Sequence, residues 1–315
     1  MLTLAHLSDL HLPLPALASW RALTNKRVLG YLSYRFKRKW VHRQSVLAAL
    51  VDDLHRQAPD HIVITGDLTN LALPEEFNAA TTWLDDLATG AMLTVIPGNH
   101  DALVDVPWPQ SLGRWTAYMS DADAAPTDPS GFPFVRRRGP IALVGVSSAC
   151  PSPPFCATGR IGERQLGRLA QILDQLDSPS TCRVVLVHHP PIAGMMAHRK
   201  RLIDHAAFRE VIRTAGAELI LHGHHHRFSQ DAIATPRGKA PVIGVPSASA
   251  ARHLGHLHAS YHLCRLDARD SGWQLEIEIR GLNEAEDGFL FERKLVKQVP
   301  RDPNPAHSSA FKASK

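Results

Sequence analysis

The sequence predicts an α/β fold, and three observations predict it. Short apolar runs that suit buried strands alternate with longer segments whose apolar residues have helical spacing. Polar side chains follow five of these runs directly, and open α/β sheets build their sites at the carboxyl ends of strands. The chain has 315 residues, of which 44% are hydrophobic and 21% charged, so it can bury a core without disulfide bonds.

The predicted strands and helices follow from apolar spacing. Seven short runs rich in Val, Ile and Leu are predicted to be buried strands, at 2–7, 62–64, 92–96, 141–146, 184–187, 219–221 and 242–245. Four segments with apolar residues three and four apart are predicted to be helices, at 45–57, 75–87, 163–176 and 208–214. Two late segments alternate apolar and polar residues, as half-buried antiparallel strands do, at 261–266 and 273–279.

Domain organisation is predicted from composition along the chain. Residues 1–300 are expected to form a single domain, and the Pro/Ser-rich segment 301–315 a disordered tail. An insertion at 19–43 interrupts the first strand–helix unit and contains eight basic residues, five aromatic residues and no acidic residue. A solvated helical face, a segment on an anionic bilayer, or a grip on a large anionic or lipidic substrate would each suit this composition.

Several classes of protein are excluded by simple counts. No apolar stretch is long enough to span a bilayer, and the N-terminus lacks a basic region and a small-residue cleavage site. The four cysteines have no CxxC spacing and are expected to be reduced thiols. These features predict a cytoplasmic protein. The net charge of +5 favours anionic partners without selecting one.

Histidine is unusually frequent, with 19 residues, and it is the commonest metal ligand in proteins. Many histidines lie in five motifs that follow predicted strands. These motifs are SDLH from Ser8, TGDLTN from Thr65, PGNHD from Pro97, HHPP from His188 and LHGHHH from Leu221. Because the motifs follow separate strands, we expect their side chains to meet at one edge of the fold.

The ordered set resembles the calcineurin-like metallophosphoesterases, whose pattern is DxH, GD, GNH[DE], H and GHxH. The motifs cover residues 9 to 226, about two-thirds of the chain, and five ordered blocks are a specific signal. The resemblance implies a four-layer αββα sandwich with a dinuclear metal centre at the strand ends. It assigns Asp9, His11 and His226 to one metal, Asn99, His188 and His224 to the other, and Asp67 to a bridge between both.

The resemblance also implies the chemistry of this centre. A metal-bound hydroxide would attack a phosphoester, and His100, held by Asp101, would donate to a phosphate or leaving-group oxygen. Mixed carboxylate and imidazole ligands suit Mn, Fe or Zn, with Mn the first choice. Two divalent ions, two aspartates and a bridging hydroxide leave a net charge of about +1, which suits an anionic substrate.

The remaining histidines have less specific interpretations. His6 lies inside the first predicted strand and is expected to be structural. His189, His222 and His225 adjoin the motifs, and a substrate-binding role for His222 is one alternative to a structural one. Four further histidines could border the site or lie on the surface; they are His253, His256, His258 and His262.

The first prediction of function is hydrolysis of a phosphodiester, as in cyclic-nucleotide phosphodiesterases. The insertion favours an alternative, a membrane-associated pyrophosphohydrolase of a UDP-diacylglucosamine-type lipid A precursor, peripheral to the inner membrane face. A ligand-binding scaffold without turnover is a third reading, which the complete ligand set disfavours. Nucleic acid is not an expected partner, because the net charge is small and no capping domain follows residue 226. The sequence leaves the oligomeric state open.

Overall fold

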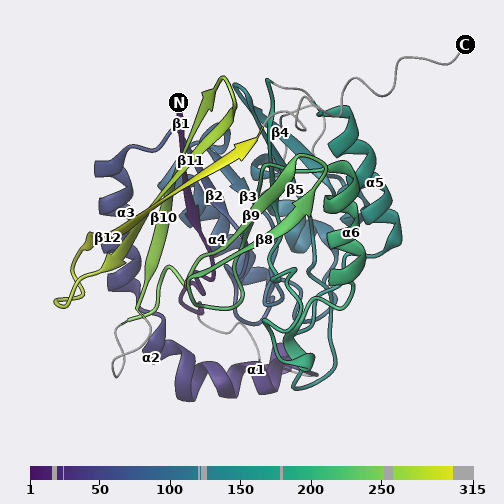
Figure 1. Cartoon of the computed structure of the whole chain (residues 1–315). Helices are drawn as coiled ribbons and strands as arrows, with labels where there is room; N and C mark the ends of the chain where they lie inside the picture. The colour runs from purple at the N-terminus through teal and green to yellow at the C-terminus, as the bar shows by residue number, and fades with distance from the viewer. Residues whose placement is uncertain are drawn as a thin grey trace, which may run out of the picture.

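Two six-stranded sheets form the centre of the protein (Figure 1). The computed structural model describes residues 1–15, 20–23, 25–119, 121, 126–177, 180–251 and 258–300. The strands of the first sheet are β1 (Leu2–Leu7), β2 (His61–Ile64), β3 (Leu93–Val95), β10 (Ser260–Arg269), β11 (Gly272–Leu282) and β12 (Phe289–Pro300). Their order is β12-β11-β10-β1-β2-β3, in which β1, β2 and β3 are parallel and β10 runs antiparallel to β1.

The second sheet also combines parallel and antiparallel strands. Its strands are β4 (Phe134–Arg138), β5 (Ile141–Gly145), β6 (Cys182–Leu186), β7 (Leu219–His222), β8 (Ser229–Thr235) and β9 (Gly238–Gly244). They lie in the order β4-β5-β6-β7-β9-β8, and the four central strands are parallel. The parallel strands therefore bring the motif-bearing carboxyl ends to one end of the structure.

Four helices cover the two sheets and produce a four-layer arrangement (Figure 1). They are α3 (Gln44–Gln57), α4 (Pro74–Leu87), α5 (Glu163–Gln175) and α6 (His205–Ala215). Alternate residues of β5 separate into two hydrophobic clusters: Leu143 lies with the first sheet, α3 and α4, whereas Val144 lies with α5 and α6. The predicted αββα sandwich and all four predicted helices are thus confirmed, with shifts of a few residues at helix ends.

Three strands were not predicted, and each lies at the edge of a sheet. These strands are β4, β8 and β12, which carry FVRRR, SQDAIAT and FLFERKLVKQVP. An edge strand has only one neighbour and is protected from further pairing by charged and polar side chains, so its apolar signal is weak. The predicted tail at 301–315 lies outside the described residues, and the single-domain boundary stays a prediction.

The insertion is helical and lies across one end of the sheets (Figure 1). It contains α1 (Arg27–Ser33), a π-helical segment (Tyr34–Arg38) and α2 (Lys39–Val41). We call residues 27–41 the cap. Single-turn elements elsewhere are at Trp20–Leu23, Gly90–Met92, Trp108–Gln110, Leu112–Tyr118, Pro129–Gly131 and His198–Lys200.

The cap is fastened to the body of the protein at both ends. Near its start, the ammonium group of Lys26 donates hydrogen bonds to the carbonyl oxygens of Ser152 and Cys156, at 3.0 and 2.9 Å. At its end, the backbone of Val41 accepts a hydrogen bond of 2.7 Å from the amide of Ala251. The cap therefore bridges loops that follow strands of the second sheet.

Candidate metal centre

The five predicted motifs meet at the carboxyl ends of β1, β2, β3, β6 and β7. Five of their non-glycine residues have a left-handed backbone, namely Asp9 (φ 53°), His11 (43°), Asp67 (58°), His224 (63°) and His226 (55°). Such conformations are costly for residues with a Cβ atom and concentrate at functional sites. The five residues belong to the first, second and fifth motifs, so strained backbone marks three of the five motifs.

The first donor group consists of Asp9, His11 and His226, whose potential ligand atoms lie within 4.8 Å of one another. Asp9 is fully buried, and its Oδ2 accepts a hydrogen bond of 2.9 Å from the backbone amide of His224. Its Oδ1 is 3.1 Å from His226 Nε2 yet has no hydrogen-bond partner. A buried carboxylate oxygen without a donor fits a cation held between these side chains.

The second donor group consists of Asp67, His188 and His224, again within 4.8 Å. His188 Nε2 lies 3.5 Å from Asp67 Oδ2 and 3.2 Å from Asn99 Oδ1, so Asn99 joins this group. The other ring nitrogen of His188 lies 2.6 Å from the carbonyl oxygen of Thr65, which turns Nε2 toward the site. Two adjacent sets of imidazole and oxygen donors fit a pair of divalent metal ions.

Asp67 lies between the two donor groups. Its Oδ2 is 3.9 Å from His11 Nε2, and its Oδ1 accepts a hydrogen bond of 2.7 Å from the backbone amide of His100. The absence of a side chain at Gly98 makes this position accessible, because a Cβ atom there would lie 2.2 Å from Asp67 Oδ1. This position is the one that a bridging ligand needs.

The predicted pairing of His100 with Asp101 is wrong in its detail. The carboxylate of Asp101 accepts hydrogen bonds from the backbone amides of Asp67, Thr69 and Gly98, at 2.8 to 2.9 Å, and from the hydroxyl of Thr69 at 3.0 Å. Its oxygens therefore hold two motif loops together and do not reach the His100 ring. His100 Nδ1 lies 2.9 Å from the carbonyl oxygen of Asn70, which takes the orienting position instead.

Two residues of the insertion reach the site, and motif reading alone missed both. Arg38 Nη1 lies 2.9 Å from Nδ1 and 3.2 Å from Nε2 of His100. His42 follows the cap, and its ring centroid is 4.4 Å from that of His11 and 5.9 Å from that of His226. The only available signal was their membership of an acid-free basic segment beside the first motif.

Burial and neighbouring cations disfavour added positive charge around the cap. Burial, followed by the charge of Arg38, lowers the pKa of His100 to about 4. Burial, followed by His226 and Arg38, lowers the pKa of His42 to about 3. In contrast, burial and the charge of Asp67 raise the pKa of Asp101 to about 7. The cap side of the site thus presents one fixed cation and neutral imidazoles.

The other histidines of the motifs have structural contacts. His6 Nε2 lies 3.0 Å from the hydroxyl of Thr65, as expected of a structural residue. His189 is buried, lies 2.7 Å from the Ser148 hydroxyl and packs its ring 4.4 Å from that of His224. His222 is buried at the end of β7, with its ring 3.3 Å from the hydroxyl of Ser229. These contacts favour the structural reading of His222.

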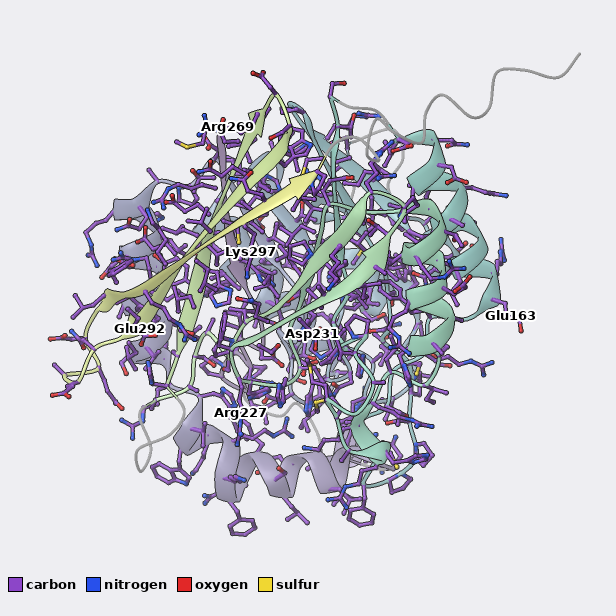
Figure 2. All side chains as sticks on the ribbon, viewed as in Figure 1. Glu163, Arg227, Asp231, Arg269, Glu292 and Lys297 are labelled. Carbon is purple, nitrogen blue, oxygen red and sulfur yellow. The ribbon has the colours of Figure 1, made fainter. Side chains whose placement is uncertain are left out.

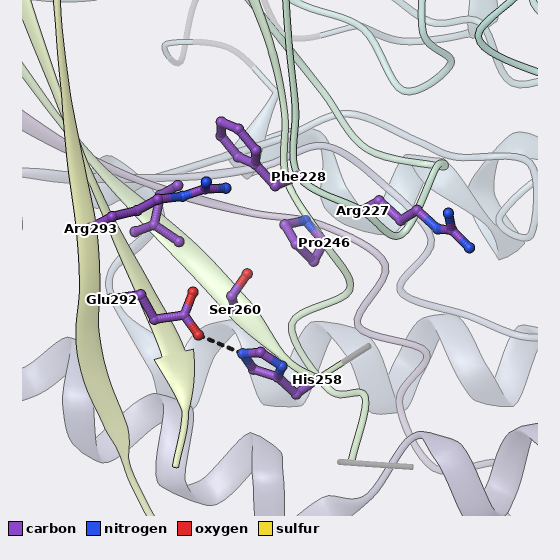
Figure 3. A pocket seen from close by; sticks show the side chains of 8 residues that line it. Arg227, Phe228, Pro246, His258, Ser260, Glu292 and Arg293 are labelled. Carbon is purple, nitrogen blue, oxygen red and sulfur yellow. Dashed lines mark hydrogen bonds and ion pairs between the residues drawn. The ribbon is translucent and has the colours of Figure 1, made fainter. Parts of the chain in front are cut away.

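The structure describes two of the four histidines between residues 253 and 262, namely His258 and His262. His253 and His256 lie outside the described residues. His258 Nε2 donates a hydrogen bond of 2.5 Å to the carboxylate of Glu292 at the wall of a cavity of about 540 Å³, which Arg227 and Phe228 also line (Figure 3). Figure 2 shows Arg227 at the cap end of the molecule and Arg269 at the opposite end. His262 is buried in β10, where its ring packs against Phe228.

Comparison with known proteins identifies the family. The sequence model of the calcineurin-like phosphoesterases matches residues 2–228. The chain belongs to this family. Calcineurin-like phosphoesterases are hydrolases of phosphoric esters, so the enzyme class expected from the motifs is confirmed.

Two curated relatives of this calcineurin-like phosphoesterase are named probable cyclic nucleotide phosphodiesterases. One, from Synechococcus, is 26% identical over 237 residues, which is 73% of this chain and 80% of the relative. The other, from Rhodococcus erythropolis, is 27% identical over 173 residues, which is 53% of this chain and 52% of the relative. Among solved structures, a dimetal phosphatase from Danio rerio shares the fold, with a TM-score of 0.61 and 13% identity over 95% of this chain and 99% of that one.

Proposed function

We propose that this phosphoesterase hydrolyses phosphodiesters, with cyclic nucleotides as the substrate class, and uses two divalent metal ions. The proposal of two metal ions rests on two donor groups, one around Asp9 and one around His188, with Asp67 between them. Within each group, the potential ligand atoms lie within 4.8 Å of one another. The names of two relatives support the diester part, since both are described as probable cyclic nucleotide phosphodiesterases.

In this proposal, Asp9, His11 and His226 hold one metal ion, and Asn99, His188 and His224 hold the other. Asp67 contributes to both. When bound, divalent ions would supply Lewis acidity toward phosphoryl oxygens. Manganese is our first choice, because carboxylate, amide and imidazole donors together suit a metal of intermediate hardness, and iron and zinc also suit them.

The cap supplies a further cation for the phosphate. The guanidinium of Arg38 lies beside His100, and a planar guanidinium binds two phosphoryl oxygens at once better than an ammonium group does. Its Nε is buried without a hydrogen-bond partner, which leaves donor capacity for a ligand. We therefore place a non-bridging phosphate oxygen between Arg38 and the metal centre.

His100 acts on the same phosphate in this proposal. With the Asn70 carbonyl oxygen 2.9 Å away, Nδ1 is assigned as the N–H that donates a hydrogen bond to it. Nε2 then carries the lone pair, and it accepts a hydrogen bond from Arg38 Nη1 at 3.2 Å or from a protonated substrate oxygen or water. Arg38 Nη1 lies 3.2 Å from Nε2, so both side chains border the same position. Asp101 does not contact the substrate in this proposal. Its carboxylate accepts hydrogen bonds from the amides of Asp67 and Gly98 and so fixes the two loops that carry them.

The test compares hydrolysis of bis-p-nitrophenyl phosphate and p-nitrophenyl phosphate, and then of cyclic AMP and AMP, with Mn²⁺ and with EDTA. We expect faster cleavage of the two diesters and loss of activity with EDTA. An Asp67→Asn variant purified in parallel controls for contaminating phosphatases. Faster cleavage of the monoesters would contradict the diester proposal but leave the metal centre intact, and activity in EDTA would contradict the metal centre.

The lipid A alternative gains no support from these relatives. This alternative rested on the basic and aromatic composition of the insertion. In the structure, these residues lie on two different faces of the insertion. Arg38 and His42 point toward the site, whereas a second set of basic and aromatic residues is exposed: Arg35, Phe36, Lys37 and Trp40. The outward face therefore calls for its own explanation.

A further inference from the structure

We propose that the outer face of the cap binds an anionic lipid bilayer. Four apolar side chains of the cap are exposed, namely Val28 (43%), Leu32 (45%), Phe36 (75%) and Trp40 (63%). They recur every fourth residue, a spacing that places side chains on one face of a helix. Exposed apolar stripes of this kind mark interaction sites on soluble proteins, because they otherwise cost free energy in water.

The inward side of the cap is occupied by contacts with the rest of the protein, so only its outer side is available to a bilayer. Arg27 donates hydrogen bonds to the carbonyl oxygens of Leu71 and Ala72, at 3.0 and 2.6 Å, and Arg38 reaches His100. The inward side of the cap therefore carries Arg27 and Arg38, whereas its exposed side carries the four apolar side chains. The apolar side of this helix is not covered by any part of the chain that the structure describes.

The exposed positive charges of the cap favour an anionic bilayer as its binding partner. Arg35 and Lys37 are exposed beside the apolar stripe, and the ammonium of Lys39 lies 4.5 Å from the Trp40 ring centroid. No acidic residue occurs between 19 and 43. Aromatic and aliphatic side chains interleaved with cations suit the boundary between acyl chains and anionic headgroups, where each cation adds about 1 kcal/mol of attraction.

The neighbouring loops continue this surface. Phe155 is 77% exposed and precedes Cys156, whose carbonyl oxygen binds Lys26 at the start of the cap. The amide of Ala157 donates a hydrogen bond of 2.8 Å to the carbonyl oxygen of Arg199, which places the exposed basic turn His198–Lys200 alongside. An exposed aromatic side chain and exposed cations therefore lie near the start of the cap.

The surface is also preformed. The cap is held at Lys26 and, after its last residue, by two backbone hydrogen bonds: the amide of Ala251 to Val41 at 2.7 Å and the amide of Arg43 to Ser249 at 3.1 Å. A segment that is already ordered loses little conformational entropy when it binds. Binding therefore needs no folding transition, in contrast to amphipathic segments that become helical only on a bilayer.

The experiment measures flotation of the full-length protein with vesicles of phosphatidylcholine alone and of phosphatidylcholine mixed with phosphatidylglycerol. We expect binding to the mixed vesicles only, and at least about a tenfold weaker partition for the Phe36→Ala/Trp40→Ala variant and for the Arg35→Glu/Lys37→Glu variant. Phe291→Ala is the matched control, because Phe291 is 57% exposed on β12, far along the chain from the cap. Circular dichroism and hydrolysis of a soluble diester verify that each variant is folded.

Three results would overturn the proposal. The first is no flotation of the wild-type protein with mixed vesicles. The second is equal flotation with neutral vesicles, which would remove the anionic lipid as the partner. The third is a wild-type dimer that the Phe36→Ala/Trp40→Ala variant converts to a monomer without any vesicle binding, which would make the face a contact between two copies. If the wild-type protein does not hydrolyse diesters, the proposed function is contradicted, whereas the proposal of bilayer binding is unaffected.

Discussion

The guanidinium of Arg38 lies 2.9 Å from Nδ1 and 3.2 Å from Nε2 of His100, so the cap places a cation against the ring proposed to act on the phosphate. Among the residues that the structure describes, no carboxylate forms an ion pair with Arg38. Asp67 and Glu76 act on Arg38 through their charge without an ion pair, so the guanidinium keeps donor capacity for an anionic ligand.

Replacing Arg38 is expected to weaken substrate use strongly. Arg38→Ala should lower kcat/KM for bis-p-nitrophenyl phosphate by about 10- to 100-fold, which corresponds to a charge-assisted hydrogen bond. Arg38→Lys should recover only part of the loss, because an ammonium group cannot form the paired contact. Arg35→Ala is the control, since Arg35 is exposed on the same π-helical segment. Equal kinetics for Arg38→Ala and Arg35→Ala would refute this role.

Replacing Asp67 is expected to impair both metal binding and turnover. Asp67→Asn keeps the shape of the side chain but removes the charge between the two donor groups, so we expect loss of bound metal and more than about a hundredfold loss of kcat. Metal content by elemental analysis and steady-state kinetics check this. Asp52→Asn, in an exposed position of α3, should change neither. Wild-type metal content and turnover in Asp67→Asn would contradict a bridging role.

Adding one methyl group at Gly98 is expected to displace Asp67. The new Cβ atom would lie 2.2 Å from Asp67 Oδ1 and 2.6 Å from its backbone nitrogen, so the loop must move. We expect Gly98→Ala to lose about 1–3 kcal/mol of unfolding free energy and most of its activity. Gly167→Ala provides the contrast, because nothing lies within 4 Å of a Cβ atom there and alanine favours the helix α5 by about 1 kcal/mol. Urea unfolding and diester kinetics measure both effects, and a fully active Gly98→Ala would be the contrary outcome.

The buried carboxylate of Asp53 is expected to make stability depend on acid pH. It accepts hydrogen bonds from Tyr261 at 2.6 Å and from Arg280 at 2.7 Å, which join α3 to β10 and β11. Burial opposes ionisation, but the hydrogen bonds from Arg280 and Tyr261 outweigh it and lower the pKa of Asp53. An acid with a lowered folded-state pKa stabilises the protein above the unfolded-state value of 3.8, and this stabilisation is lost as the pH falls through the folded-state value.

Asp53→Asn should therefore cost about 3 kcal/mol near neutral pH and progressively less toward about pH 3. Urea unfolding of the wild type and the variant over that pH range measures the difference. Asp52→Asn, next to it on the exposed side of α3, should track the wild type at every pH. A difference between wild type and Asp53→Asn that stays constant with pH would show that ionisation of Asp53 does not contribute.

The sequence was most informative where chemistry restricts residue type. Asp9, Asp67 and His188 were predicted as site residues because few other side chains can hold metals, and the structure brings them together at the strand ends. The buried strands and the four covering helices were predictable for a similar reason, since burial requires apolar spacing. Edge strand β4 escaped detection because three of its five residues are arginines, of which Arg136 is buried.

The insertion shows what composition could not resolve. Its basic residues look alike in sequence, but Lys26 and Arg27 hold backbone carbonyls, Arg38 faces His100, and Arg43 pairs with Glu286 at 2.8 Å. Only tertiary contacts separate these roles. The role of Asp101 was misjudged for a related reason, because the backbone amides that occupy its oxygens come from a different loop.

The position of β1 determines when the site can be completed as the chain is synthesised. β1 pairs with β2 nearby in sequence, but its other neighbour is β10, where Leu4 is opposite Cys264. Pairing across such a sequence separation makes folding slow. Asp9 and His11 therefore leave the ribosome long before His224 and His226, which complete their donor groups. The full set of proposed metal donors exists only after β7 of the second sheet has formed, so a metal ion held by both parts of the chain would bind after they assemble.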